Sequence, residues 1–393
     1  MSVHRSMGDA FPSGRTAIVG AATYGMGTTP GLNNFDLAAR ASLKALGQVG
    51  LTSGDVDGLA IVVMDETLSV LNFADYLGIR PRFIDNTRTG GSSFQILAED
   101  AALALSAGQC DEVLIAYGSD QRSSAGKLVT SARSSPWEAP YKPLRPISSY
   151  AMAAARHMHE YGTTKRHLGE VAIAARRWAQ LNPDATMRDP LTMDDYLGAR
   201  MVADPFGTRD CCLVSDGAAA VVMVRADYAR DLARRPVFLL GAAHETTHRE
   251  IASMPDLTRT GAARAAERAF AQAGIRASDV DVVELYDAFT INTILFLEDM
   301  GFCPKGEGGR FVSEGAIAPG GRLPVNTNGG GLSCVHPGMY GLFTMVEAAQ
   351  QIMGVCGDRQ VADAQIAVSQ GNGGELSSEA VLVLGSAETL TRS

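Results

Sequence analysis

The 393-residue chain lacks the segments that would direct a protein into or across a membrane. No uninterrupted apolar run reaches the roughly 18 residues of a membrane-spanning helix, so we expect no such helix. The first residues, MSVHRSMGDAFPSG, contain no long apolar core, and we therefore expect no signal peptide. Net charge is −9, and this acidic balance argues against a general nucleic-acid or membrane-surface binder.

The sequence also lacks the cysteine spacings of a metal site or a disulfide framework. None of its six cysteines forms a CxxC pair, and Cys211 and Cys212 are adjacent. This pattern suits a reducing compartment, so we predict a cytoplasmic protein without a bound metal. Hydrophobic residues make up 46% of the chain and charged residues 20%, which is typical of a well-packed globular protein.

What the chain does contain is an internal repeat. Residues 15–62 and 237–285 carry the same features in the same order: a Gly-Ala-Ala after the opening strand, an Ala-Arg-Ala helix, a glycine and an Asp-Val-Asp. The spacing from Arg40 to its Asp-Val-Asp equals the spacing from Arg264 to the second one. The alternation of strands and helices predicts two layered α/β halves that pack about a pseudo-twofold axis.

Each copy continues with a glycine-rich elbow that opens a helix. The elbows are NTRTGG (86–91) and NTNGGG (326–331), and strands are expected at 112–120 and 365–374. A longer insertion separates the copies, with a helix that Thr163 or Thr164 is expected to cap. The predicted organisation has a first half (1–120 with 208–235), an inserted loop domain (121–207) and a second half (236–393).

Three segments carry a resemblance to a known family. They are NGGGLSCVHPGMYG (328–341), ELYDAF (284–289) and DCCLVSDGAAAVVM (210–223). Together with the duplicated order, they resemble the thiolase superfamily in its branch of sterol-carrier-protein-type thiolases, or lipid-transfer proteins. The resemblance covers about residues 15–390. It implies a five-layered α/β/α/β/α fold, usually a dimer, that acts on acyl-coenzyme A.

The chain departs from that family where the family places its two catalytic cysteines. The first position falls near Thr89 or Gly90, and the second falls at Ser369, whereas His336 matches the family's histidine. A thiol is already partly ionised at neutral pH, but a serine needs an adjacent base to act as a nucleophile. We therefore expect Ser92 and Ser93 to cap the elbow helix. Cys334 is the alternative nucleophile, because alternation along an extended segment would place it beside His336.

Two tyrosines are candidates to take over the role of the missing cysteines. Tyr286 lies in ELYDAF, where the family has Asn or His, and Tyr340 lies four residues after His336. The chain resembles the family's cysteine-less retro-aldol lyases, which cleave β-hydroxyacyl-CoA. We predict Tyr286, His336 and Tyr340 as catalytic residues. The loops expected to line the pocket or bind an oxyanion contribute six residues: Gly90, Gly91, Ser92, Ser369, Gly371 and Gly373.

Retro-aldol chemistry needs a base for the β-hydroxyl and donors for the thioester enolate. A tyrosinate is the base if its pKa falls from about 10, and His336 with glycine-loop amides holds the enolate. Which tyrosine is acid and which is base stays open. We expect no tightly bound cofactor, with coenzyme A as part of the substrate and its contacts in 121–207 and 244–260.

Two other functions stay open at this point. One is a Claisen-type thiolase or acyltransferase with an atypical nucleophile, and the other is a non-catalytic thiolase-like subunit. The resemblance also implies a homodimer and a small partner protein built from a zinc ribbon and an OB-fold, of the DUF35 type, which helps to bind the acyl-CoA.

Overall fold

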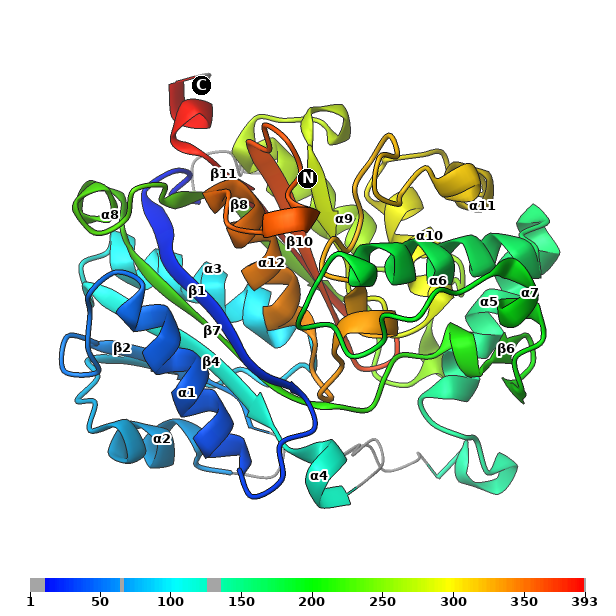
Figure 1. Cartoon of the computed structure of the whole chain (residues 1–393), viewed down its shortest axis with the longest axis horizontal. Helices are drawn as coiled ribbons and strands as arrows, with labels where there is room; N and C mark the ends of the chain where they lie inside the picture. The colour runs from blue at the N-terminus through cyan, green and yellow to red at the C-terminus, as the bar shows by residue number, and fades with distance from the viewer. Residues whose placement is uncertain (1–10, 64–66, 126–135, 392–393) are drawn as a thin grey trace, which may run out of the picture.

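The computed structural model describes residues 11–63, 67–125 and 136–391. Most of the segment on which the signal-peptide prediction rests, and residues 126–135 of the insertion, lie outside this part of the chain. The larger sheet contains nine strands: β1 (Thr16–Gly27), β2 (Gly58–Ile61), β3 (Phe83–Asp85), β4 (Glu112–Ser119), β7 (Asp216–Arg225), β8 (Val237–Thr246), β9 (Val282–Glu284), β10 (Ile366–Gly373) and β11 (Ser378–Gly385). Their order is β3-β2-β4-β7-β1-β8-β11-β10-β9. Figure 1 labels these strands except β3 and β9.

The strand order repeats on the two sides of the β1–β8 contact. In the first half, β1 and β7 are antiparallel, β7 and β4 are antiparallel, and β4 and β2 are parallel. In the second half, β8 and β11, β11 and β10, and β10 and β9 follow the same directions. β3 extends the first half, whereas its counterpart is reduced to one parallel bridge between Val283 and Val325. The predicted duplication is confirmed.

Helices form three layers around these strands. The middle layer is α3 (Ser93–Ser106) and α12 (Gly341–Met353), which contact each other and strands of both halves. α1 (Asn34–Gly47) and α2 (Ser69–Leu77) cover the first half from outside, and α9 (Ala262–Ala273) covers the second. The five-layered thiolase-like fold is therefore as expected. No helix of the described chain is long and apolar enough to cross a membrane.

The repeated Gly-Ala-Ala marks the place where each outer helix touches its sheet. A Cβ atom at Gly20 would lie 2.4 Å from the carbonyl oxygen of Ala45, and one at Gly241 would lie 2.1 Å from that of Ala269. Both distances are below van der Waals contact, so only glycine permits the helix backbone to approach this closely. The motif recurs because the same packing recurs.

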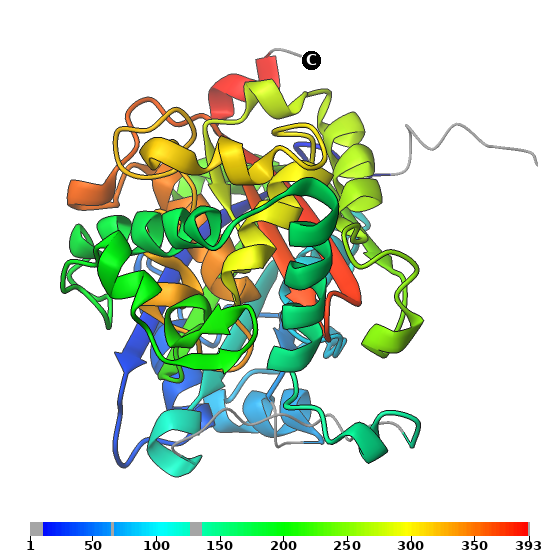
Figure 2. The ribbon, with the colours of Figure 1, turned by 90° about the vertical axis from the view of Figure 1, so that its right-hand side faces the viewer.

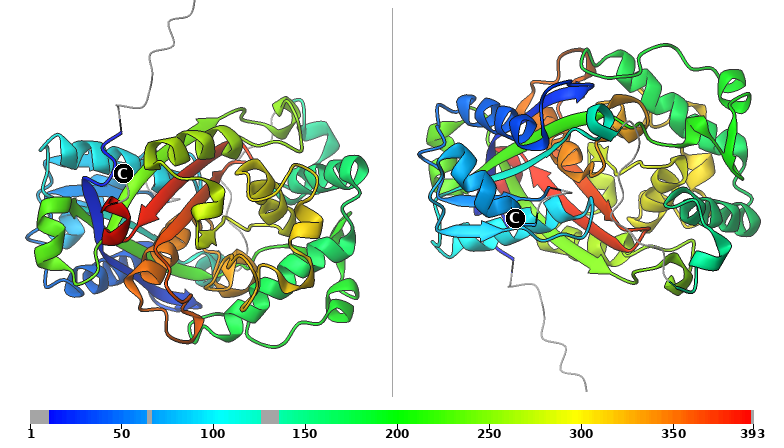
Figure 3. Two further views of the ribbon diagram at one scale, coloured as in Figure 1. Left: turned by 90° about the horizontal axis from the view of Figure 1, so that it is seen from above. Right: turned by 90° about the horizontal axis from the view of Figure 1, so that it is seen from below.

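Most of the insertion lies at the opposite end of the molecule from α1 and α2 (Figure 3), and its helices face the viewer in Figure 2, whereas its first helix contacts β7 in the first half. Its elements are α4 (Gln121–Ala125), α5 (Ile147–Tyr161), α6 (Lys165–Gln180), α7 (Met193–Leu197) and the β5–β6 pair (Met201–Ala203 with Phe206–Gly207). As expected, Thr164 caps α6, since its side chain accepts from the amide of His167 at 3.3 Å. The remaining helices are α8 (Ala226–Leu232), α10 (Thr290–Asp299) and α11 (Gly308–Phe311).

Candidate active site

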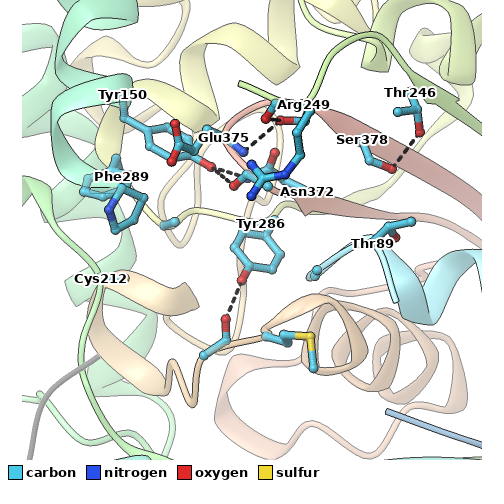
Figure 4. A pocket seen from close by; sticks show the side chains of 18 of the residues that line it. Thr89, Tyr150, Cys212, Thr246, Arg249, Tyr286, Phe289, Asn372, Glu375 and Ser378 are labelled. Carbon is cyan, nitrogen blue, oxygen red and sulfur yellow. Dashed lines mark hydrogen bonds between the residues drawn. The ribbon is translucent and has the colours of Figure 1, made fainter. Parts of the chain in front are cut away.

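A cavity of about 450 Å³ lies where the two elbows, the end of β10 and the insertion meet. Tyr286 stands near its centre in Figure 4, below Tyr150 and Asn372 and beside Thr89. The wall combines residues from several segments of the chain, among them Thr89, Gly90 and Gly91; Pro146 and Tyr150; Cys212; Tyr286, Ala288 and Phe289; His336, Gly338 and Met339; Asn372, Gly374 and Glu375. Arg88, His248 and Arg249 add cationic or titratable groups.

His336 presents an unsatisfied imidazole to this cavity. Its backbone is held firmly, because its amide donates to Ser215 Oγ (2.9 Å) and its carbonyl accepts from Gln121 Nε2 (3.0 Å). The side chain is only 3% exposed, yet neither ring nitrogen has a hydrogen-bond partner among the described residues. Burial lowers the pKa of His336 to about 4, so the ring is neutral at pH 7 and offers one donor and one acceptor. Buried polar atoms without a hydrogen-bond partner are rare, so we expect a bound ligand to interact with these two ring nitrogens.

Tyr286 lies edge-on to His336, with ring centroids 5.5 Å apart and an interplanar angle of 88°. Its hydroxyl donates to the carbonyl of Gly338 at 3.2 Å, and its backbone amide donates to Gln370 Oε1 at 3.1 Å. Burial raises the pKa of Tyr286, so the hydroxyl stays protonated in the free protein. The condition under which a tyrosinate would be the base, a lowered pKa, is not met by Tyr286, which is better suited to donate a hydrogen bond than to remove a proton.

Tyr340 belongs to the same aromatic group but does not reach the cavity. Its ring lies 6.1 Å from that of His336, nearly parallel to it, and stacks on Phe343 at 5.7 Å. The side chain is fully buried, and its hydroxyl donates to Asn328 Oδ1 at 2.9 Å. The structure thus brings the three predicted residues together and places Tyr340 behind His336, in a position to support it.

The first elbow lies against β10 as a close backbone contact. Gly90 and Gly91 line the cavity, as expected. A Cβ at Gly371 would lie 2.9 Å from the Cα of Ser92, and one at Gly373 would lie 2.0 Å from the carbonyl oxygen of Thr89. These two glycines therefore seat the elbow on the strand and stand behind the cavity wall.

The serines also lie behind the wall. Ser92 occupies the N-cap position of α3 but makes no cap hydrogen bond, and its hydroxyl contacts Thr89 Oγ1 (2.8 Å) and Ser378 Oγ (3.1 Å). Ser93 Oγ accepts from the amide of Thr89 at 2.9 Å. The capping prediction is wrong, because both hydroxyls tie the elbow together. Ser369 is fully buried and bonded to Gln95 and Thr344 at 3.0 and 2.9 Å.

Cys334 does not share the cavity with His336. A π-helical turn over Gly330–Cys334 replaces the expected extended segment, so the predicted alternation is wrong. Cys334 is fully buried, its sulfur lies 3.9 Å from Met26 Sδ, and burial raises the pKa of its thiol. The thiol on the cavity wall is Cys212, whose pKa burial also raises. The described residues contain no cluster of three or more His, Cys, Asp or Glu suited to a metal ion.

Asp287 connects the second elbow to the ELYDAF segment. Its Oδ1 accepts from the amide of Gly331 at 2.6 Å, and burial raises its pKa to about 7. It therefore holds the turn that precedes His336. Sequence reasoning assigned no role to this residue, nor to Cys212, Tyr150 or Asn372, which line the cavity.

Comparison with known proteins agrees with this geometry. Residues 243–386 match the family described as "Thiolase C-terminal domain-like". The chain is 33% identical to a 17-hydroxy-3-oxo-4-pregnene-20-carboxyl-CoA lyase of Mycobacterium tuberculosis, over 92% of this chain and 97% of that protein. The chain belongs to the thiolase superfamily.

Within the superfamily, both lyases and acyltransferases resemble this chain. An acetyl-CoA acetyltransferase of Methanothermobacter thermautotrophicus is 33% identical over 91% of this chain and 96% of its own length. The solved structure of an Ltp2-ChsH2(DUF35) aldolase superposes with a TM-score of 0.86 at 30% identity, covering 95% of this chain and 98% of that one. The thiolase relationship is therefore settled over nearly the whole chain, and the reaction must be argued from the site.

Proposed function

We propose that the protein cleaves a carbon–carbon bond of a β-hydroxyacyl-CoA by a retro-aldol reaction. The products are a ketone or aldehyde and a shortened acyl-CoA. The observation that carries this proposal is the composition of the cavity: neither position equivalent to a thiolase cysteine is a thiol, while an unpartnered neutral His336 and a protonated Tyr286 lie together. Relatives named lyase and aldolase support it.

The two side chains suit the two needs of the reaction. The lone-pair nitrogen of His336 takes the proton of the β-hydroxyl, the carbonyl forms as the bond between the α- and β-carbons breaks, and the electron pair passes to the thioester as an enolate. The hydroxyl of Tyr286 turns from Gly338 to donate to the thioester oxygen. The developing enolate charge favours the imidazolium, which returns its proton to the α-carbon. These roles reverse those expected from the sequence, because burial lowers the pKa of His336 and raises that of Tyr286.

A panel of β-hydroxyacyl-CoA and β-ketoacyl-CoA thioesters, each with and without free coenzyme A, tests the reaction class. We expect cleavage of β-hydroxyacyl-CoA without added coenzyme A, detected as ketone or aldehyde release. Thiolysis has an absolute requirement for coenzyme A, because its thiol is the second substrate. An absolute requirement would replace the proposal by a thiolase function.

The Claisen-type alternative is kept because Cys212 lines the cavity and a relative is named acetyl-CoA acetyltransferase. Rapid mixing with an acyl-CoA followed by mass measurement of the intact protein separates the two reactions. A stoichiometric acyl adduct would support acyl transfer, and its absence during turnover would support the retro-aldol route.

We further propose that the protein works with a small partner of the DUF35 type, as the name of the similar aldolase complex suggests, and that it is a cytoplasmic homodimer. The described chain contributes the catalytic fold but no zinc ribbon or OB-fold. We expect the protein produced alone to be poorly active or unstable, and co-expression with the partner to restore soluble, active complex. The measurement is specific activity per mole of the thiolase-like chain; equal activity in both preparations would count against the partner.

A further inference from the structure

One hydrogen bond on the cavity wall joins the insertion to the core. The amide nitrogen Nδ2 of Asn372, at the end of β10, donates to the hydroxyl of Tyr150, in α5, at 2.8 Å. Both side chains are 2% exposed, and both line the cavity that holds Tyr286 and His336. Figure 4 shows the pair directly above Tyr286. The pair therefore lies within the site, and its two residues are distinct from His336 and Tyr286, which carry the proposed reaction.

The orientation of the Asn372 side chain follows from the second bond of Tyr150. A phenol has a single hydrogen, and Tyr150 donates it to the carbonyl oxygen of Gly374 at 3.2 Å. Burial raises the pKa of Tyr150, so this hydrogen is retained at neutral pH. The phenol oxygen can then only accept from Asn372, which requires the NH₂ group to face the tyrosine. The carboxamide oxygen is thereby directed away from Tyr150.

That oxygen has no partner. Asn372 Oδ1 is buried and receives no hydrogen bond from any described residue. Buried acceptors of this kind are rare in folded proteins, and an unmade hydrogen bond at such a group is costly. A bound ligand that donates a hydrogen bond would satisfy it. A ligand that presents a carbonyl oxygen would instead bring two acceptors together.

We infer that Asn372 Oδ1 accepts a hydrogen bond from the β-hydroxyl of the substrate, and that Tyr150 is the positioning residue that keeps this oxygen facing the cavity. The pair thus selects β-hydroxyacyl over β-ketoacyl thioesters before any bond is broken. The inference rests on the proposed function for the identity of the substrate. Its physical basis, a buried acceptor without a partner on a residue that lines the cavity, is independent of the reaction.

The test is a comparison of binding between two inert probes. In CoA thioethers with a methylene in place of the thioester carbonyl, no thioester enolate can form, so neither a 3-hydroxyalkyl-CoA nor its 3-oxoalkyl-CoA counterpart can undergo retro-aldol cleavage. Mass analysis of both probes after the titration checks that they stay intact, since the 3-oxo probe can lose coenzyme A by β-elimination. Titration calorimetry on the full chain, with its partner where required, gives the two dissociation constants. We expect the hydroxy probe to bind at least about tenfold more tightly, the ratio that one unmade hydrogen bond produces.

Variants assign this ratio to the pair. Tyr150→Phe removes the phenol oxygen, frees the amide to turn and should bring the ratio close to one. Asn372→Leu removes the acceptor and should do the same. Tyr76→Phe deletes a tyrosine hydroxyl that bonds to Asp36 on α1, outside the cavity lining, and should keep the wild-type ratio. Thermal melting identifies the folded variants.

A wild-type ratio near one, failure of both probes to bind, or an unchanged ratio in folded Tyr150→Phe would overturn the inference. Its failure is distinguishable from failure of the proposed function. If the enzyme cleaves β-hydroxyacyl-CoA but the two probes bind equally well, the inference is wrong and the proposed function stands. A retained ratio with no cleavage in the panel removes the retro-aldol function and leaves the hydroxyl-selective site.

Discussion

Replacing His336 by alanine should lower kcat/KM for cleavage by a factor of about 10²–10⁴, the usual contribution of a general acid–base residue. Tyr286→Phe should lower it by about 10²–10³, the usual cost of losing a donor to a developing oxyanion. Both side chains are buried on the cavity wall, and neither ring nitrogen of His336 has a hydrogen-bond partner among the described residues. Steady-state rates on the substrate found in the panel provide the measurement.

The pH profile adds a readout that a merely structural role would not produce. Burial lowers the pKa of His336 to about 4, so the free enzyme keeps a neutral imidazole from neutral pH down to that value. The His336-dependent part of kcat/KM should therefore persist as pH falls through about 6.5, the ordinary histidine pKa, and decline only near 4. If His336→Ala and Tyr286→Phe both folded and left the activity of the purified complex intact, this chain would be a non-catalytic subunit of that complex.

Gly91→Ala should abolish cleavage almost as completely, through displacement of the neighbouring side chains. The new methyl group would lie 1.9 Å from Tyr286 Cε2 and 2.6 Å from the carbonyl oxygen of Asn372. Neither neighbour can retreat, since Tyr286 is packed against His336 and Tyr340, and Asn372 is paired in the sheet. Overpacking of this kind typically costs about 1–3 kcal/mol. Rates and thermal melting measure both consequences.

Gly47→Ala is the matched control. Gly47 ends α1 on the surface, and no described atom beyond its local neighbours lies within 4 Å of the position of a Cβ. That variant should keep wild-type activity and melting temperature. Full activity of Gly91→Ala would show that the elbow and Tyr286 are less rigid than their contacts indicate.

The sequence predicted the fold well because a duplication repeats its packing requirements. Gly20 and Gly241 recur for one physical reason, the contact with an outer helix. The pattern on α3 was less informative. The first two turns of the helix are buried all round, Ser93 and Gln95 included, because the helix lies between strands of both halves, whereas its C-terminal end reaches water at Leu103, which is 44% exposed. A helix becomes part of the middle layer only when the two halves assemble, so its sequence shows only a weak periodic pattern of apolar residues.

The site was predictable where one motif carries the geometry. The sequence predicted that His336 and Tyr286 lie in one site because each stands in a recognisable motif, and both line the cavity, with ring centroids 5.5 Å apart. Cys334 was misplaced because Gly329 and Gly330, at φ of 105° and 65°, begin a π-helical turn that alternation does not describe. The Tyr150–Asn372 pair was missed because its members are 222 residues apart in the chain, and neither stands in a motif.

The unequal ends of the sheet bear on how copies of the chain can associate. At the second-half end, Val283 exchanges hydrogen bonds of 3.0 Å with Pro324 and Asn326, which occupy the outer edge of β9. At the other end, β3 has no described strand on its outer side. A pseudo-symmetric chain with two free edges could polymerise head to tail into filaments. If copies pair through β3, the free edge of this sheet in the described part of the chain, they join like to like, and the growth of the assembly stops at two.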